Sequence, residues 1–397
     1  MQSHGFLGLL GLLLGLAFAS EEVFRRWRIP PALALMLSGF LVGPVLKLMP
    51  PERFLEVAPH FGALAFLLIL LEGGLDLDLE RTIGSLRTAL RTAAVTFVLS
   101  WTLIAAIAAA HGLGWRAATL LGLALAPLSG AILIPLLGRL ELPQTLRAVL
   151  VVDAALADVF GVLGLSLAIQ LLEPGGWKTL LAVGTLLAAV LSIALGVALG
   201  LAWPHAIRSL SERAYLDVLG FGVALALWGA VASIGAPGAP AVLAFGLTLG
   251  NESKLRSRLR LPAIAGVDAE GEVAALHRFI GQLNFVIRTF FFVLLGVVVR
   301  LDEVTWRGAS LVVCAVIAAL AIRYLALRGL PLTAAGPSLA LLVAMQPRGL
   351  VNAVLAIDIE SHATFATTPL AIVSLAILLT NLVLAVALVR WGKARTA

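Results

Sequence analysis

Residues 146–171 read LRAVLVVDAALADVFGVLGLSLAIQL, an apolar run long enough to cross a lipid bilayer as one helix. Two carboxylates, Asp153 and Asp158, lie inside this run, and Asp158 is close to its midpoint. A charged side chain at the centre of a bilayer costs roughly 3 kcal/mol or more, so carboxylates kept there usually serve a function. The competing interpretation is a packing role, in which an Asp pairs with a buried Arg.

The rest of the chain has the same apolar character. Of its 397 residues, 61% are hydrophobic and only 13% are charged, about half the charged fraction of an average soluble protein. Apolar runs of about 20 residues recur along nearly the whole length, so we predict an all-α polytopic membrane protein. The formal charge of +6 is explained by basic residues in short loops, and we expect membrane lipid rather than nucleic acid as the partner.

The pattern predicts thirteen spans in a single transmembrane domain, residues 1–397. The spans cover about residues 4–20, 30–49, 60–76, 88–110, 117–138, 146–171, 179–203, 214–234, 238–250, 279–299, 308–327, 334–357 and 366–389. Most of the 28 Lys and Arg residues follow odd-numbered spans or lie in the C-terminal tail. The positive-inside rule therefore places the N-terminus outside the cell membrane and the C-terminus in the cytoplasm. The longest connection, residues 251–278, is expected to be a cytoplasmic loop.

Internal repetition is visible between spans of opposite orientation. The second span, PALALMLSGFLVGP (31–44), and the ninth, PAVLAFGLTLGN (240–251), both begin at a Pro and carry glycines four residues apart. The ends of the third and tenth spans, FLLILLEGGLDLD (66–78) and FFFVLLGVVVRLD (290–302), also match. These matches predict a first inverted repeat at about 1–171, a linking helix at about 179–203 and a second repeat at about 214–389.

Helix breakers occur in two corresponding spans of these repeats. The fifth span carries Pro127, Gly130 and Pro135, and the twelfth carries Pro347 and Gly349. Such breaks in two oppositely oriented halves indicate a transporter's binding site. We expect the breaks to expose backbone carbonyls and helix ends to a cation.

A transporter that exchanges a cation for protons needs one group that binds either species. A carboxylate in a cavity can do this, because water access lets it titrate while desolvation strengthens its hold on a proton. Asp158 is our candidate for this group, and it is the expected ligand of a monovalent cation. Ser129, beside the first predicted break, offers a hydroxyl to the same site.

Asp153 lies five residues before Asp158, about 140° around the helix, so the two carboxylates cannot share one face. We therefore expect Asp153 to form a structural ion pair with an arginine of another span, and we also count it with Asp158 and Ser129 among the candidate ion- and proton-binding residues. Arg323 is the first choice of partner, and Arg348 and Arg288 are the alternatives. Glu72, late in the third span, has an undecided role.

In these and other segments the chain resembles the cation/proton antiporter superfamily, most closely prokaryotic sodium/proton exchangers of the thirteen-helix type. The segments that carry the resemblance are PALALMLSGFLVGP (31–44), FLLILLEGGLDLDL (66–79), VLAFGLTLGN (242–251), IRTFFFVLLG (287–296), AIRYLALR (321–328) and MQPRGLVNAVLA (345–356). The resemblance implies an inverted-repeat fold with two broken helices that cross in the core. It further implies a homodimer, in which six core helices move against a dimerisation domain, and exchange of Na⁺ (or Li⁺ or K⁺) for H⁺. No cofactor and no enzymatic activity are expected.

The resemblance also implies roles for individual residues. Asp158 falls on the family's essential aspartate, and Arg348 on the arginine of its RG motif. Asp153 falls where one branch carries a Glu that pairs with an arginine, here Arg323. Arg288 is close to the position where electrogenic members carry a lysine.

Three positions depart from the family pattern. Ala157 stands where Asn or Asp is usual, Ala154 where Ser is often found, and Leu128-Ser129-Gly130 where Thr-Asp-Pro or Thr-Ser-Pro is usual. Side-chain ligands expected near the ion are therefore missing, which leaves the cation preference open. Without a second acidic residue beside Asp158, electroneutral one-for-one exchange is the simpler expectation, although Arg288 argues for an electrogenic one.

Two other functions fit parts of the pattern. A Na⁺-coupled carrier of an organic anion could use a similar inverted-repeat fold. An intramembrane aspartyl protease is a remote alternative, because it needs two carboxylates that share a proton. Asp153 and Asp158 point to different faces of one helix and do not meet that need.

Overall fold

The computed structural model describes most of the chain and contains only helices and loops in that part. The described residues are 3–27, 30–47, 58–138, 140, 142–172, 178–210, 215–260, 269–299, 303–328, 338–360, 362–365 and 367–396. The helices are α1 (Ser3–Trp27), α2 (Pro31–Phe40), η1 (Leu41–Val45), α4 (Ala58–Asp76), α5 (Leu79–Ala110), α6 (Trp115–Leu125), α7 (Gly130–Gly138), α8 (Gln144–Leu172), α9 (Lys178–Leu210), α10 (Leu216–Ser233), α11 (Gly238–Gly250), α12 (Glu252–Arg258), α13 (Ala269–Val298), α14 (Trp306–Leu327), α15 (Leu339–Ala344), α16 (Leu350–Ile359) and α17 (Pro369–Thr396).

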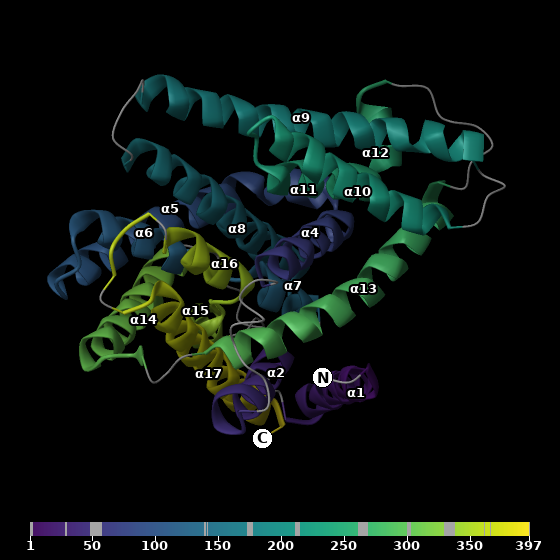
Figure 1. The fold of residues 1–397 in the computed structure, drawn as a ribbon. Helices are drawn as coiled ribbons and strands as arrows, with labels where there is room; N and C mark the ends of the chain where they lie inside the picture. The colour runs from purple at the N-terminus through teal and green to yellow at the C-terminus, as the bar shows by residue number, and fades with distance from the viewer. Residues whose placement is uncertain are drawn as a thin grey trace.

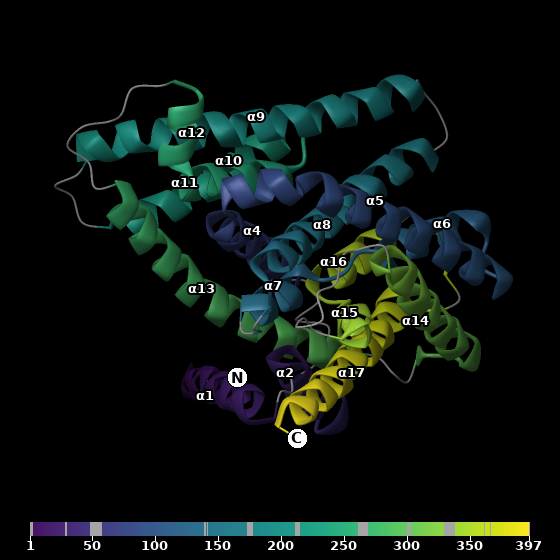
Figure 2. The same ribbon diagram turned by 180° about the vertical axis from the view of Figure 1, so that it is seen from behind.

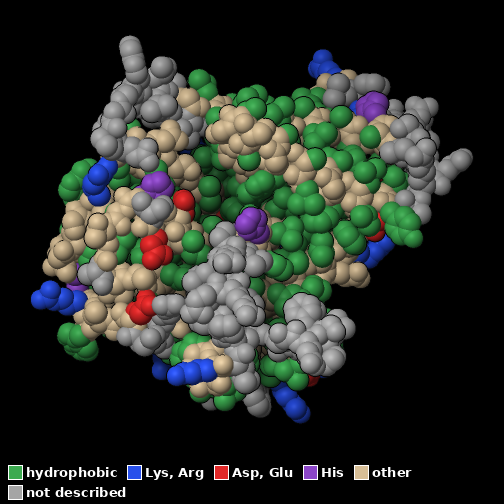
Figure 3. Space-filling model, viewed as in Figure 1, with side chains coloured by type: hydrophobic (Ala, Val, Ile, Leu, Met, Phe, Trp, Pro, Cys, Tyr) green, Lys and Arg blue, Asp and Glu red, His purple; other side chains and the backbone are tan. Residues whose placement is uncertain are grey.

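Each of the thirteen predicted spans contains helix in the part of it that the structure describes, which confirms the predicted fold class. The second span is α2 continued by the π-helical turn η1, and the fifth and twelfth spans are each split in two, as α6–α7 and α15–α16. Among the described residues, seven helices are long and apolar enough to cross a membrane, and three further apolar helices are shorter. Hydrophobic side chains cover much of the face in Figure 3, with Lys and Arg mostly near its edges, as expected for a surface in lipid.

Two helices begin nine or ten residues earlier than predicted, and the expected cytoplasmic loop is partly helical. α5 begins at Leu79 rather than at residue 88, and α13 begins at Ala269 rather than at residue 279. The added turns are rich in Ala, Leu, Glu and Arg, which are good helix formers. The predicted spans were bounded by hydropathy, so they left out the charged turns at the start of each of these helices. The connection 251–278 accordingly holds α12 and the first turns of α13.

The helices form two groups. The core group consists of α5, α6, α7, α8, α14, α15, α16 and α17, and the scaffold group consists of α1, α2, α4, α9, α10, α11, α12 and α13. Within the scaffold group α11 packs on α4 and α9, and α13 packs on α2 and α4. Figures 1 and 2 show α9, α10 and α11 along one side of the molecule and α14–α17 on another, with α4 and α8 between them.

Matching glycine contacts relate the two repeats. The second span packs on the tenth at Gly39, where an added Cβ would lie 2.0 Å from Val293 O. The ninth span packs on the third at Gly246, where an added Cβ would lie 2.6 Å from Leu71 O. Small residues allow membrane helices to approach this closely. The second span corresponds to the ninth in the two repeats, and the third corresponds to the tenth. Each of these contacts is therefore the counterpart of the other, as expected for an inverted-repeat fold.

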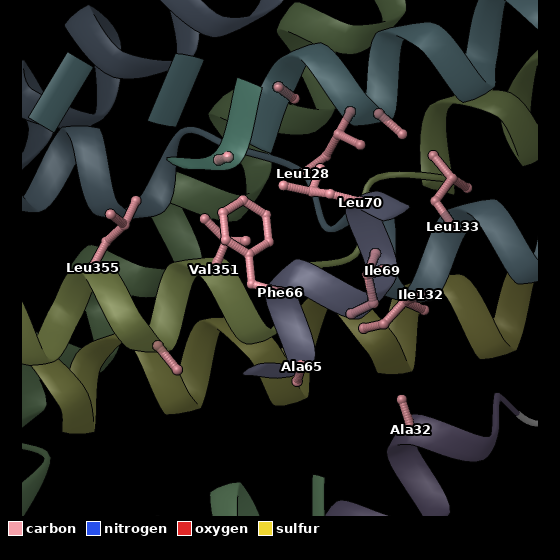
Figure 4. Packing of buried hydrophobic residues seen from close by; sticks show 14 of the residues in the cluster. Ala32, Ala65, Phe66, Ile69, Leu70, Leu128, Ile132, Leu133, Val351 and Leu355 are labelled. Atoms are coloured by element: carbon pink, nitrogen blue, oxygen red, sulfur yellow. The ribbon is translucent and has the colours of Figure 1, made fainter. Parts of the chain in front are cut away.

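The seam between the two groups is apolar where α4 faces the core group. Figure 4 shows Phe66, Ile69 and Leu70 of α4 lying against residues of α7, α16 and the segment before α7. These are Leu128, Ile132, Leu133, Val351 and Leu355. A seam without hydrogen bonds or ion pairs between these side chains can slide with little loss of specific interactions.

Candidate functional site

Two broken helices cross in the core group. The segment between α6 and α7 meets the segment between α15 and α16, because the Ser129 N–H donates to the Pro347 carbonyl at 2.7 Å. Pro127 and Pro347 lie in these segments, where a residue without an N–H favours the end of a helix. Gly349 permits the close approach, since an added Cβ would lie 2.4 Å from Ser129 Oγ. Pro135, the third helix breaker of the fifth span, lies within α7 rather than in the break, as prolines in membrane helices can.

Asp158 of α8 points at this crossing and is only 1% exposed. Its Oδ2 accepts a hydrogen bond of 3.1 Å from the Gly130 N–H, the first residue of α7. Its Oδ1 has no hydrogen-bond partner among the described residues, and neither has the buried Oγ of Ser129. The carboxylate therefore faces the positive end of α7 and keeps one oxygen free for a proton or a cation.

Asp153 makes a separate contact on the same helix. Its Oδ2 lies 2.5 Å from Nη1 of Arg323 on α14, and the two side chains are 1% and 0% exposed. Asp153 Oδ1 and Arg323 Nε and Nη2 have no hydrogen-bond partner among the described residues. The structure thus places the two carboxylates of α8 with different partners, Asp153 with Arg323 and Asp158 with the start of α7.

Arg348 lies at the crossing without contacting either carboxylate. Its Nε donates to the Leu125 carbonyl at 2.7 Å, and its Nη1 donates to the Gln346 carbonyl at 3.1 Å. Its backbone N–H donates to Thr380 Oγ1 at 3.0 Å. Since Leu125 is the last residue of α6, the guanidinium lies at the partially negative end of that helix.

Two asparagines that the sequence interpretation overlooked hold the breaks in shape. Asn352 Nδ2 donates to the carbonyls of Ala124 and Pro127, both at 2.9 Å, and its Oδ1 accepts from the Gly349 N–H at 2.8 Å. Asn381 Nδ2 donates to the Arg348 carbonyl at 2.9 Å. The sequence did contain a signal for these two residues, because an amide side chain inside an apolar span needs a hydrogen-bond partner within the membrane.

These contacts change the expected role of the backbone carbonyls. Carbonyls of both breaks already accept hydrogen bonds, namely those of Ala124, Leu125, Pro127, Gln346, Pro347 and Arg348. Among the described residues, the side-chain oxygens without a hydrogen-bond partner near the crossing include Asp158 Oδ1 and Ser129 Oγ. A carboxylate and a hydroxyl therefore offer unpartnered oxygens at the site, whereas these six carbonyls already accept hydrogen bonds.

Two other candidates lie in the scaffold group. Arg288 Nη2 lies 3.5 Å from Glu21 Oε1, which joins α13 to α1. Glu72 of α4 accepts a hydrogen bond from Asn284 Nδ2 of α13. The structure therefore does not bring Arg288 to the crossing, and Glu72 joins two scaffold helices.

Two pockets open on the seam between the groups. One, of about 450 Å³, lies between α4, α8, α10 and α16, and its lining includes Phe66, Val162, Trp228 and Val351. The other, of about 40 Å³, lies between α1, α2, α7 and α13 and includes Ile132 of α7. Each pocket approaches the crossing along a different half-helix, α16 or α7.

Comparison with known proteins agrees with this arrangement. The family model described as sodium/hydrogen exchanger, transmembrane, matches residues 9–393. The Na(+)/H(+) antiporter 1 of Methanocaldococcus jannaschii is 27% identical over 94 residues, which are 24% of this chain and 22% of that protein. The match thus spans about a fifth of the relative's length.

Solved structures show the same fold. A structure of the sodium proton antiporter MjNhaP1 from Methanocaldococcus jannaschii at pH 8 superposes with a TM-score of 0.75 at 20% identity, covering 100% of this chain and 98% of that one. A second structure of MjNhaP1, from an electron-microscopy map, gives a TM-score of 0.75 at 21% identity and covers 99% and 97% of the two chains.

Proposed function

This chain belongs to the sodium/hydrogen exchanger family, and from that premise we propose that it exchanges a monovalent cation for H⁺ across the cell membrane. Family and structural neighbours are transporters rather than enzymes. Na⁺ is the first candidate for the cation, with Li⁺ and K⁺ as the alternatives.

The observation that carries this proposal is the half-satisfied carboxylate of Asp158. It is buried at the crossing, bound through Oδ2 to the Gly130 N–H, and unpartnered at Oδ1. A proton on Oδ1 and a cation beside Oδ1 both neutralise the same charge, so the two cannot bind together. Loading the cation expels the proton, and this competition couples the two fluxes. Ser129 Oγ is positioned in the same break to serve as a further cation ligand.

The contacts of Asp153 support a one-for-one exchange. Arg323 neutralises Asp153 at 2.5 Å, so this carboxylate serves as the structural partner and not as a second carrier. Arg288 is engaged with Glu21 in the scaffold group and adds no charge at the crossing. One titrating carboxylate then carries one proton or one monovalent cation per cycle.

The two groups and the seam between them support transport by alternating access. The core group carries Asp158, and a movement of this group along the apolar seam exposes the carboxylate to one seam pocket and then to the other. We assign the first inverted repeat to about 1–171, the linking helix to about 179–203 and the second repeat to about 214–389. The N-terminus is placed outside and the C-terminus in the cytoplasm, and the active form is a homodimer.

The test is dissipation of a pH gradient in proteoliposomes on addition of Na⁺, Li⁺ or K⁺. The wild-type protein should respond to at least one cation between pH 6 and 9, and Asp158→Asn should not. Glu22→Gln is the matched control, since Glu22 is an exposed carboxylate that pairs with Arg25 on the same helix turn. Folded wild-type protein that responds to none of the three cations would refute antiport, and full exchange by Asp158→Asn would refute the role of Asp158.

A further inference from the structure

The chain passes between the scaffold group and the core group three times. The first crossover is the short link, residues 77–78, between α4 and α5, and the third joins α13 to α14. The second joins α8 to α9. Any movement of the core group must be accommodated at these links, because hinges lie at a few loop or helix-end residues.

The first crossover is fastened to the scaffold group on both sides of residue 78. Asn251, which directly follows α11 and is 3% exposed, donates from Nδ2 to the Leu77 carbonyl at 2.6 Å and accepts from the Leu79 N–H at 2.7 Å. Lys254 of α12 adds an ion pair of 2.5 Å with Asp78. One side chain thus satisfies two backbone groups of the link.

The side chains of Asn251 and Lys254, which together we call the clamp, are themselves anchored in the scaffold group. Asn251 Nδ2 also donates to the Leu247 carbonyl of α11 at 2.9 Å. Arg256, one turn after Glu252, pairs with it and donates to the Leu201 carbonyl of α9 at 2.7 Å. The short helix α12 is therefore held against α9, a helix of the scaffold group.

The third crossover is fastened to the opposite group. Thr368 Oγ1, directly before α17, donates to Glu303 at 2.7 Å, and Thr305 Oγ1 lies 3.4 Å from Thr367 Oγ1. Thr305 also caps α14, accepting from the Gly308 N–H at 3.1 Å. The end of this crossover therefore belongs to the core group, whereas the first crossover belongs to the scaffold group.

From this asymmetry we propose that Asn251 and Lys254 are positioning residues that hold the start of α5 as a fixed pivot for the core group. Releasing the clamp in every cycle would leave Asn251 and two backbone groups unpaired in a buried place, which is unfavourable. The clamp therefore stays closed in both orientations, and the displacement is greatest away from residues 77–79. This proposal rests on the proposed antiport by a moving core group.

Reversible cross-linking tests the pivot in the full-length protein. The single cysteine, Cys314, is exposed and is first replaced by Cys314→Ala. The pivot pair is Asp78→Cys with Lys254→Cys, whose side chains are both partly exposed. The seam pair is Ala63→Cys with Val354→Cys, which line the 450 Å³ pocket from opposite groups. Each pair is joined with a short bis-methanethiosulfonate linker in proteoliposomes, and exchange is measured before and after reduction.

We expect the pivot cross-link to leave exchange at or above the rate of the reduced form. The seam cross-link should lower exchange at least tenfold, with recovery on reduction. A reversible tenfold loss with the pivot cross-link, alongside the same loss at the seam, would overturn the pivot and leave the antiport proposal standing. Unchanged exchange with the seam cross-link would instead overturn the moving core group, and the pivot with it.

A kinetic measurement separates positioning from simple structural support. Asn251→Ala should lower the maximal rate severalfold with the apparent KM for the cation unchanged, because Asp158 is not touched. Thr248→Val is the matched control, since Thr248 is equally buried on α11 and its hydroxyl only donates to the Ala244 carbonyl at 2.7 Å. A maximal rate in Asn251→Ala equal to that of Thr248→Val contradicts the pivot.

Discussion

Neutralising either Asp153 or Arg323 alone is expected to destabilise the protein more than neutralising both. The two side chains are 1% and 0% exposed and lie 2.5 Å apart on α8 and α14. Three of their polar atoms, Asp153 Oδ1 and Arg323 Nε and Nη2, have no hydrogen-bond partner among the described residues. Each charge therefore depends on the other, and removing one leaves a buried charge without a counterion.

The magnitude follows from the burial of the pair. At 2.5 Å and an effective dielectric constant of about 20, Coulomb's law gives a gross attraction of roughly 6–7 kcal/mol. Desolvation of both ions offsets much of this, and breaking a buried pair by removing one partner typically costs about 3–5 kcal/mol. Asp153→Asn and Arg323→Met should each fall in that range. The double variant should lose less stability than either single variant, because no unpaired charge remains.

The assay is reversible unfolding in mixed micelles, followed for the wild type, both single variants and the double variant. The exposed pair of Glu22 and Arg25, 2.8 Å apart with side chains 48% and 80% exposed, serves as the control cycle. The coupling energy of this exposed pair should be about 1 kcal/mol or less. If the losses at Asp153 and Arg323 add without coupling, the two residues do not stabilise the protein as an ion pair.

Three further predictions concern the crossing and the helix contacts. The first concerns pH values at which most molecules carry a proton on Asp158. There the apparent KM for the cation should rise about tenfold for each unit by which the pH is lowered, because cation and proton compete. A pH-independent KM with a changing maximal rate argues against a shared site. Asn352→Ala should lower the free energy of unfolding by about 2–4 kcal/mol, since buried backbone groups of both breaks lose their partner, and an unchanged thermal midpoint would contradict this. Gly246→Ala should disrupt the α4–α11 contact and lower the thermal midpoint, whereas Gly222→Ala, with nothing within 4 Å of the added Cβ, should not.

The helices and their order could be predicted from the sequence because lipid imposes a strong constraint. An apolar run of about 20 residues must satisfy its backbone internally, which makes it a helix. The two breaks were also predictable, since Pro127 and Pro347 each lie within such a run. The early start of α5 at Leu79 was not, because its first turns carry charges and hydropathy reports burial in lipid rather than helix formation.

The contacts of the site required the structure. Asp153 and Asp158 could be given different faces from helical periodicity, but the partners of the arginines depend on which helices are neighbours. Arg288 illustrates this, because α13 packs in the scaffold group and its guanidinium lies near Glu21. The breaks were located from Pro and Gly, and Asn352 was overlooked because it is not a helix breaker. Its side chain nevertheless supplies hydrogen bonds to the backbone groups of the breaks from the first turn of the following helix.

The helix ends at the crossing bear on the exchange of a proton for a cation that we propose at Asp158. Arg348 balances the negative end of α6 at Leu125, and Asn352 caps the start of α16 through the Gly349 N–H. The positive end of α7 has Asp158 as its partner at the Gly130 N–H. A proton or a monovalent cation at Oδ1 adds the same single charge to this otherwise balanced arrangement. We therefore infer that the surrounding core experiences the same charge whether Asp158 holds a proton or a cation. The core group can then move with either one bound.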